Sequence, residues 1–123
     1  MFHYLFLAKL CAIFQKLDEL GKKGVRVLGF VPDCWLPALY RHALAFVYPS
    51  IYEGFGLPPL EAMSYETPVI VSKSSSLPEV AGDAALYIDP HSIDSIQSAI
   101  ENIVTDSILR SQLSKLDSIF LHT

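Results

Sequence analysis

Residues 43–72 read ALAFVYPSIYEGFGLPPLEAMSYETPVIVS, and this stretch carries the pattern that decides the fold class. Its two ends, 43–48 and 68–72, are short apolar runs of the kind found in strands buried within a sheet. Between them, Pro58 and Pro59 suit the first turn of a helix that runs to about Tyr65. A strand, a helix and a second strand in this order predict one parallel β-α-β unit.

The same alternation continues on both sides of this unit. Its predicted elements are a helix at about 9–20, a strand at 25–31, a helix from Asp33 to 40–42, a strand at 84–88, a helix after Pro90 and a helix at about 107–120. The helix after Pro90 places its apolar residues on one stripe, formed by Ile93, Ile96, Ile100, Ile103 and Val104. We therefore expect an α/β fold, with a Rossmann-like parallel sheet and helices on both faces. Ligands of such sheets bind beyond the carboxyl ends of the strands.

Composition and charge exclude several classes of function. Apolar residues make up 51% of the 123 residues, which indicates an ordered domain. The net charge of −4 gives no basic field, so we expect no nucleic-acid partner. Cys11 and Cys34 lack metal or redox spacing and are interpreted as reduced thiols of a cytoplasmic protein. The apolar residues 1–8 are too short to span a bilayer and are interpreted as a core element, with contact at the membrane surface as the alternative.

The loop between the strand at 43–48 and the following helix contains the residues suited to chemistry. Gly54 and Gly56 allow the backbone to approach a ligand closely, and free N–H groups at the helix start suit an anion. Glu53 precedes this turn, and we place Glu61 in the first turn of the helix. Two carboxylates that converge on one ligand favour a sugar or a ribose with vicinal hydroxyls. For Glu61 the alternative is a carboxylate that only stabilises its helix.

Residues 53–63, EGFGLPPLEAM, followed by Thr67-Pro68-Val69-Ile70, resemble the E-x7-E signature of the family 4 (group 1) retaining glycosyltransferases. The resemblance extends to 75–80, 82–85 and 89–90, and back to 27–31 and to Leu39-Tyr40. In all it covers about residues 25–115, in order. It implies that residues 1–123 form a single, partial C-terminal domain of a GT-B fold.

The resemblance also implies roles for individual residues. Glu53 would contact the sugar hydroxyls nearest the reacting centre and act as the catalytic residue. The donor-binding residues would be Gly54, Phe55, Gly56, Leu57, Glu61 and Val31. In this set Phe55, Gly56 and Leu57 would present N–H groups to the sugar and diphosphate, Glu61 would accept from the ribose, and the loop after Val31 would lie against the base. No metal and no other cofactor is expected.

The function that the resemblance implies is transfer of a hexosyl group, such as mannosyl or glucosyl, from a nucleoside diphosphate sugar with retention of configuration. The acceptor would be a glycan, a lipid or a small molecule. The family's N-terminal domain, and a basic pair that holds the diphosphate, have no counterpart in the chain, so we expect the chain alone to be inactive. The alternative is a non-catalytic module that binds a nucleotide sugar or a partner chain.

Several other residues carry narrower expectations. Glu66 stands where the family usually has glycine, and left-handed geometry there would cost about 1 kcal/mol. Lys73 is expected to be a solvated surface residue. Packing in the core or at its rim is expected for Trp35, Phe46 and Tyr48. Turn and capping roles are expected for Glu79 and Asp83.

Overall fold

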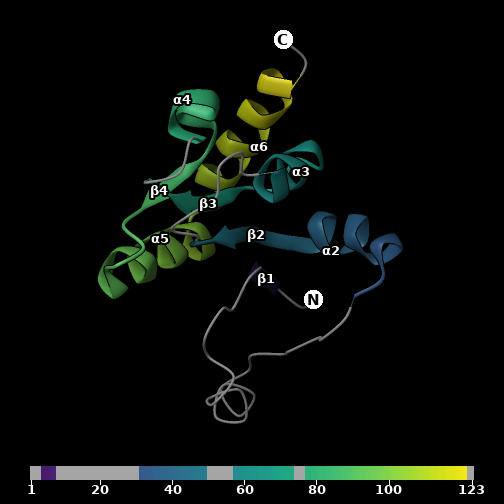
Figure 1. Cartoon of the computed structure of the whole chain (residues 1–123). Helices are drawn as coiled ribbons and strands as arrows, with labels where there is room; N and C mark the ends of the chain where they lie inside the picture. The colour runs from purple at the N-terminus through teal and green to yellow at the C-terminus, as the bar shows by residue number, and fades with distance from the viewer. Residues whose placement is uncertain (1–3, 8–30, 50–56, 74–76, 122–123) are drawn as a thin grey trace.

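The computed structural model describes residues 4–7, 31–49, 57–73 and 77–121, which form a sheet with helices against it (Figure 1). The elements in chain order are β1 (Tyr4–Leu7), η2 (Asp33–Trp35), α2 (Leu36–His42), β2 (Ala43–Tyr48), α3 (Leu57–Ser64), β3 (Val69–Ser72), α4 (Leu77–Ala81), η3 (Gly82–Ala84), β4 (Leu86–Ile88), α5 (Ile93–Thr105) and α6 (Ser107–Leu121). The strands and helices expected between residues 33 and 120 are all present. The helix expected at 9–20 and most of the strand expected at 25–31 lie outside the described residues.

The four described strands form one parallel sheet in the order β1-β2-β3-β4. Tyr4 pairs with Ala43 and Leu7 with Val47, so the apolar start of the chain is a strand of the sheet. The parallel sheet predicted from the alternation of elements is confirmed. Parallel pairing brings the carboxyl ends of β2, β3 and β4 to the same edge.

Helices cover both faces of this sheet, as expected. Alternate side chains of β2 and β3 point to opposite faces, because the side-chain period of a strand is two residues. One cluster of the core joins β2 and β3 to α2 and α3 and includes Tyr40, Phe46, Tyr48, Ala62, Met63, Val69 and Val71. The other joins the strands to α5 and α6 and includes Ala45, Val47, Ile70, Ile88, Ala99, Ile103 and Leu113.

The apolar stripe predicted for α5 is only partly correct. Ile103 is fully buried, and Ala99, which the stripe did not include, is buried beside it. Ile93 is 80% exposed and Val104 is 43% exposed. Ile93 is the first residue of α5, and the buried residues of this helix, Ala99 and Ile103, lie in its second half. Val104 follows Ile103 by about 100° around the helix axis, so only one of the two can face the core.

The structure also tests the predictions made for three aromatic and two acidic residues. Phe46 and Tyr48 are buried in the core, as expected, but Trp35 is 57% exposed, so its expected packing is wrong. Trp35 ends the single turn of η2, which has no buried residue, so it lies before the chain reaches the sheet. Glu79 and Asp83 lie exposed in the first turns of α4 and η3, two short helices that the sequence did not predict.

Glu66 has the left-handed geometry that the sequence raised as a possibility, with a φ of 59°. Its carbonyl accepts a hydrogen bond of 2.8 Å from the Ser114 hydroxyl of α6. We expect Glu66→Gly to raise the free energy of unfolding by about 1 kcal/mol, because glycine adopts this conformation without a Cβ clash. Urea denaturation followed by circular dichroism measures the change.

The matched control for this substitution is Ser64→Gly, at the exposed last residue of α3. There we expect a loss of about 0.5–1 kcal/mol, since glycine is a poorer helix former than serine and lacks the hydroxyl that donates to the Glu61 carbonyl. A loss of stability at both positions would contradict the strain assigned to Glu66.

Candidate functional site

The edge of the sheet where a ligand is expected is formed by the carboxyl ends of β2, β3 and β4. Tyr48 pairs with Val71 and Ser72 pairs with Ile88, so these strand ends lie side by side. The main-chain N–H of Lys73 donates to the Ile88 carbonyl at 2.9 Å, which extends the pairing to the edge. The side chain of Lys73 is exposed, in agreement with its interpretation as a surface lysine.

The structure describes three of the seven predicted site residues. Glu53, Gly54, Phe55 and Gly56 lie outside the described residues. Leu57 is the first residue of α3, and Val31 is half-buried shortly before η2. Glu61 lies exposed on α3. The convergence of Glu53 and Glu61 on one ligand therefore stays a prediction.

Helix α3 begins at the prolines, as the sequence predicted. Its first turn contains Leu57, Pro58 and Pro59. Proline has no N–H group, but this costs no hydrogen bond here, because the first N–H groups of a helix have no partner within it. Pro59 is fully buried and holds this end of the helix against the core. The start of α3 follows β2, so its free N–H groups and the positive end of its dipole lie on the connection that leaves the ligand edge.

The expected position of Glu61 in the first turn of α3 is wrong. The helix begins at Leu57 and has no acidic residue in its first turn, so Glu61 lies in the second. The favourable effect of the helix dipole on a carboxylate falls off within the first turn. Ala62 and Met63, the next two residues, are fully buried, which turns Glu61 outward. The interpretation of Glu61 as a helix-stabilising residue is thereby weakened, and its exposed carboxylate is available to a ligand.

An aromatic cluster lies between α2, α3 and β2 and supports this region. The ring of Tyr40 stacks on Tyr65 with centroids 5.7 Å apart and meets the edge of Phe46 at 5.4 Å. Phe46 in turn stacks on Tyr48 at 5.8 Å. The Arg41 guanidinium lies 5.2 Å from the centre of the Tyr65 ring. We call Tyr40, Phe46, Tyr48 and Tyr65 the aromatic cluster.

Tyr40 is the most strongly perturbed phenol of this cluster. Burial, followed by the negative charge of Glu61 and the neighbouring phenols Tyr65 and Tyr48, raises the pKa of Tyr40 to about 12. Its hydroxyl therefore stays protonated and neutral at physiological pH. The main chain of Tyr40 is held in place as well, because the buried Thr67 hydroxyl donates to the Tyr40 carbonyl at 2.6 Å.

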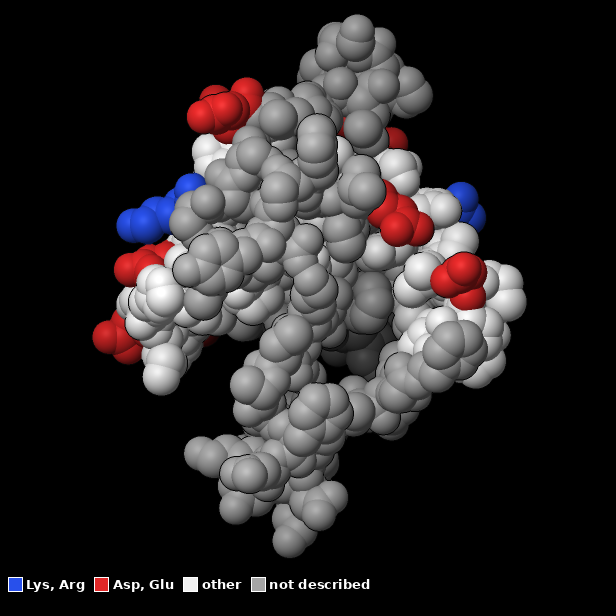
Figure 2. Space-filling model, viewed as in Figure 1, with Lys and Arg blue, Asp and Glu red and all other residues white. Residues whose placement is uncertain are grey.

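Charged side chains of the described residues are spaced apart over the face shown in Figure 2, with basic groups near opposite edges. Within the described ranges, no three histidine, cysteine, aspartate or glutamate side chains are grouped to hold a metal ion. None of the described helices is both long and apolar enough to cross a bilayer.

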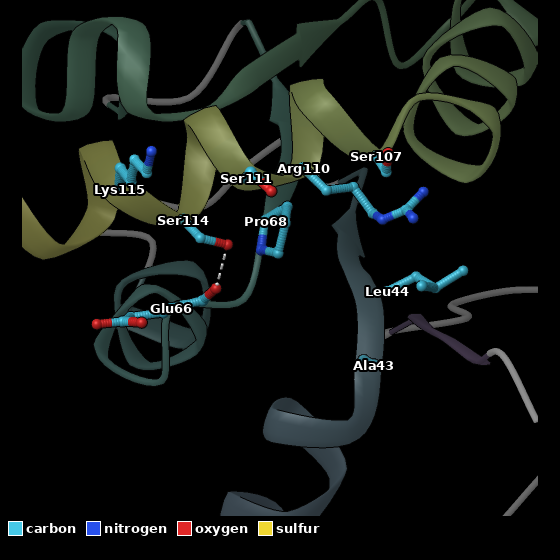
Figure 3. Close-up of a pocket in the computed structure, with 9 residues that line it drawn as sticks. All are labelled: Ala43, Leu44, Glu66, Pro68, Ser107, Arg110, Ser111, Ser114 and Lys115. Atoms are coloured by element: carbon cyan, nitrogen blue, oxygen red, sulfur yellow. Dashed lines mark hydrogen bonds between the residues drawn. The ribbon is translucent and has the colours of Figure 1, made fainter. Parts of the chain in front are cut away.

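A groove of about 470 Å³ lies at the opposite edge of the sheet, where β2 and β3 begin (Figure 3). It is lined by Ala43, Leu44, Glu66, Pro68, Ser107, Arg110, Ser111, Ser114 and Lys115. Arg110 Nη1 donates to the carbonyls of Ile103 and Val104 at 2.7 and 2.9 Å, so it closes the end of α5. The carboxylate of Glu66 points away from Pro68. The groove thus joins α6 to the sheet and lies away from the predicted ligand edge.

Two residues of interest were missed by the sequence analysis. Tyr40 was noted as a possible end of a predicted helix and within the resembling stretch Leu39-Tyr40, and nothing local indicates its central place in the aromatic cluster. Asp117 is fully buried in α6, and neither of its carboxylate oxygens has a hydrogen-bond partner. Its signal is present in the sequence, because Asp117 follows the buried Leu113 by four residues and so falls on the apolar face of α6.

Comparison with known proteins identifies related sequences. The family described as "Glycosyl transferases group 1" matches residues 10–116. The chain is 55% identical over 99 residues to the O-antigen chain mannosyltransferase B of Escherichia coli, a match that covers 80% of this chain and 26% of that protein. It is 53% identical over 77 residues to the O-antigen chain mannosyltransferase RfbU of Salmonella typhimurium, covering 61% of this chain and 22% of that protein. The chain thus spans about a quarter of the length of these relatives.

Two solved structures superimpose on the fold of this chain. The sucrose-phosphate synthase from Thermosynechococcus elongatus superimposes with a TM-score of 0.76 and 27% identity, over 88% of this chain and 29% of that one. The C-terminal domain of a glycosyl transferase group 1 family protein (LpcC) from Francisella tularensis superimposes with a TM-score of 0.71 and 30% identity, over 88% of this chain and 63% of that one.

Proposed function

Because the chain belongs to the group 1 glycosyltransferase family, we propose that it supplies the donor-binding half of a GT-B enzyme. The parallel sheet with helices on both faces is the Rossmann-like architecture that such a half requires. The observation that carries the proposal is the match of residues 10–116 to the family together with the exposed Glu61 on the helix that follows β2.

The donor that we propose is a nucleoside diphosphate mannose, and the transfer proceeds with retention of configuration. Support for mannose comes from two relatives more than 50% identical to the chain, both named O-antigen chain mannosyltransferases. Retention follows from the resemblance of residues 53–63 to the signature of the retaining enzymes.

Each predicted site residue has one role in this proposal. Glu53 contacts the sugar hydroxyls next to the reacting carbon, and Gly54 lets the backbone approach them. The N–H groups of Phe55, Gly56 and Leu57 hold the sugar and diphosphate, where the positive end of the α3 dipole stabilises the charge that develops on the leaving group. Glu61 accepts hydrogen bonds from the ribose, and the loop after Val31 lies against the base.

The acceptor and the second wall of the site belong, in this proposal, to the larger part of the relatives that the chain does not span. The acceptor must be oriented and water excluded before the sugar can be transferred efficiently. We therefore propose that the chain binds the nucleotide by itself but transfers no sugar. Addition of the remaining part of a relative would restore transfer.

Titration with guanosine diphosphate and uridine diphosphate tests the donor role. We expect one of them to bind the chain, and Glu61→Ala to weaken that binding by about 10- to 100-fold, since a charge-assisted hydrogen bond contributes about 1.5–3 kcal/mol. Isothermal titration calorimetry measures both dissociation constants.

The matched control is Glu101→Ala, which removes an exposed carboxylate on α5 that accepts a hydrogen bond of 3.0 Å from the Gln97 amide. This variant should bind like the parent. Equal affinity of the parent and the Glu61→Ala chain would exclude the ribose role. Binding without transfer, even after the rest of a relative is added, would favour the alternative of a non-catalytic binding module.

A further inference from the structure

One side of α5 carries apolar side chains that the described elements leave partly or largely exposed. Ile93 is 80% exposed and Val104 is 43% exposed, while Ile96 and Ile100 between them are only partly buried. We call Ile93, Ile96, Ile100 and Val104 the α5 flank. A groove of about 440 Å³ runs along it and is lined by Ile93, Ile96, Gln97, Ile100 and Glu101.

The α5 flank faces sideways along the sheet. Ala99 and Ile103 are buried against the strands, and Ile100 and Val104 each follow one of them by about 100° around the helix axis. The helix follows β4 from the ligand edge, and Ser107, the first residue of α6, lines the groove at the opposite edge. Helix α5 therefore runs antiparallel to the strands (Figure 1).

The handedness of the fold decides to which side this flank points. Connections between parallel strands are right-handed. For a right-handed helix that runs antiparallel to the strands on the face opposite α3, the residue that follows a sheet-facing one turns toward β1. The α5 flank therefore points toward β1 and away from β4.

The same rule predicts where the strand expected at 25–31 lies, although most of it falls outside the described residues. The connections through α3 and α4 advance from β2 to β4 and carry their helices on the α2 and α3 face. Helix α2 lies on that face and leads into β2, so the strand before it is expected on the β1 side of β2. Among the described strands β1 pairs with β2 alone, which leaves its other edge for the strand at 25–31.

A connection from β1 to that strand advances in the opposite direction, so its helix is expected on the opposite face, where α5 and α6 pack. The helix predicted at 9–20 would begin after Leu7 at the ligand edge, as α5 does, and run beside α5. With its 13 residues, α5 is about as long as the predicted helix. The apolar stripe of the predicted helix consists of Leu10, Ile13, Phe14, Leu17 and Leu20.

We propose that the α5 flank is the docking surface for the apolar stripe of residues 9–20 of the same chain. A stripe of this width on a helix above β1 faces both the sheet and the neighbouring helix. Docking removes the isoleucines of the flank from water, which is the main driving force for such packing. The docking does not depend on the donor role proposed above.

Charges beside the two apolar surfaces match in sign and in spacing. Asp94 and Glu101 are exposed and lie seven residues apart on α5. Lys9 and Lys16 are also seven residues apart, so they share one side of the predicted helix. Because both helices are expected to begin at the ligand edge, Lys9 comes level with Asp94 and Lys16 with Glu101. Exposed ion pairs add little stability, but opposite charges at equal intervals favour this register.

Nuclear Overhauser effects between methyl groups of the full 123-residue chain test the docking directly. We expect them between Ile100 or Val104 on α5 and Leu17 or Leu20 in the segment. A sample mixed from differently labelled chains separates contacts within one chain from contacts between two copies. Contacts of the flank with a second copy, or none with residues 9–20, would overturn the docking.

Substitution of an exposed isoleucine gives a second test, by stability. Ile93 and Ile108 are 80% and 69% exposed, and each lies in the first turn of its helix, but only Ile93 belongs to the α5 flank. We expect Ile93→Ser to lower the urea midpoint by about 0.5–1 M, because the docked segment covers Ile93. The matched control Ile108→Ser should unfold close to the midpoint of the parent. An unchanged midpoint of Ile93→Ser, or equal shifts of both variants, would contradict the docking.

Discussion

Replacing Asp117 with asparagine or leucine should stabilise the chain by on the order of 2–4 kcal/mol at about pH 9, because it removes an uncompensated buried charge. Asp117 is fully buried, and both carboxylate oxygens lack a hydrogen-bond partner. Burial, with a smaller contribution from the charge of Glu66, raises the pKa of Asp117 from 3.8 to about 8. Above that pH the folded chain must hold a carboxylate in an apolar environment.

The direction of the pH dependence follows from this raised pKa. The folded state binds the proton of Asp117 more tightly than the unfolded state, whose pKa is near 3.8. The stability that this group contributes is therefore fully present below pH 3.8 and is lost as the pH rises through about 8. Urea denaturation of the parent at a series of pH values should show this decline, and the slope should be absent in Asp117→Asn.

The control for this prediction is Glu101→Gln, which neutralises an exposed carboxylate on the neighbouring helix α5. Its pH profile should run parallel to that of the parent. Parallel profiles for the parent and Asp117→Asn would show that Asp117 does not titrate from a buried position. Because Glu66 contributes to the raised pKa, Glu66→Gly should also weaken the decline.

Most of the fold could be predicted from the sequence because its signals are local. The apolar runs of β2 and β3 and the prolines at the start of α3 each specify their own element, and alternation of the elements then specifies a parallel sheet. The burial of Phe46 and Tyr48 follows from their place in a central strand. The left-handed geometry of Glu66 was raised as a possibility, because the family that the sequence resembles usually has glycine at that position.

The features that the sequence did not reveal depend on how elements pack. Which side of α5 faces the sheet is decided by its contacts, and the resulting rotation buries Ala99 and exposes Val104. Trp35 is apolar enough for a core, but it lies in η2, a single turn without any buried residue. The turn of α3 that carries Glu61 depends on the residue at which the helix begins. The place of Tyr40 between two helices and a strand is a property of tertiary structure.

The second large effect on stability is expected for substitution of Phe46, a residue of the core cluster that packs against α3. Phe46 is fully buried, meets the edge of the Tyr40 ring and stacks on Tyr48. Phe46→Ala should lower the free energy of unfolding by about 3–5 kcal/mol, the range typical of a deleted core phenylalanine. Domains of this kind have about 5–15 kcal/mol in total, so a large fraction of the stability would be lost. Urea denaturation measures the loss.

Val47→Ala provides the matched control, because Val47 is the next residue of β2 and belongs to the cluster on the opposite face, against α5 and α6. It should lower stability by about 2 kcal/mol without disturbing the aromatic cluster. Phe46→Leu keeps an apolar side chain but removes the ring that supports Tyr40. At a temperature where both variants are folded, we expect nucleoside diphosphate affinity to fall in Phe46→Leu and to stay unchanged in Val47→Ala.

This difference between neighbouring positions separates a general loss of stability from a loss of the site. If affinity depended only on the folded fraction, both variants would bind like the parent once folded. If the aromatic cluster supports α3, the helix that carries Glu61, only the variant on the α2 and α3 face loses affinity. Equal weakening in both variants would indicate that the whole sheet, and not its α2 and α3 face, supports the nucleotide.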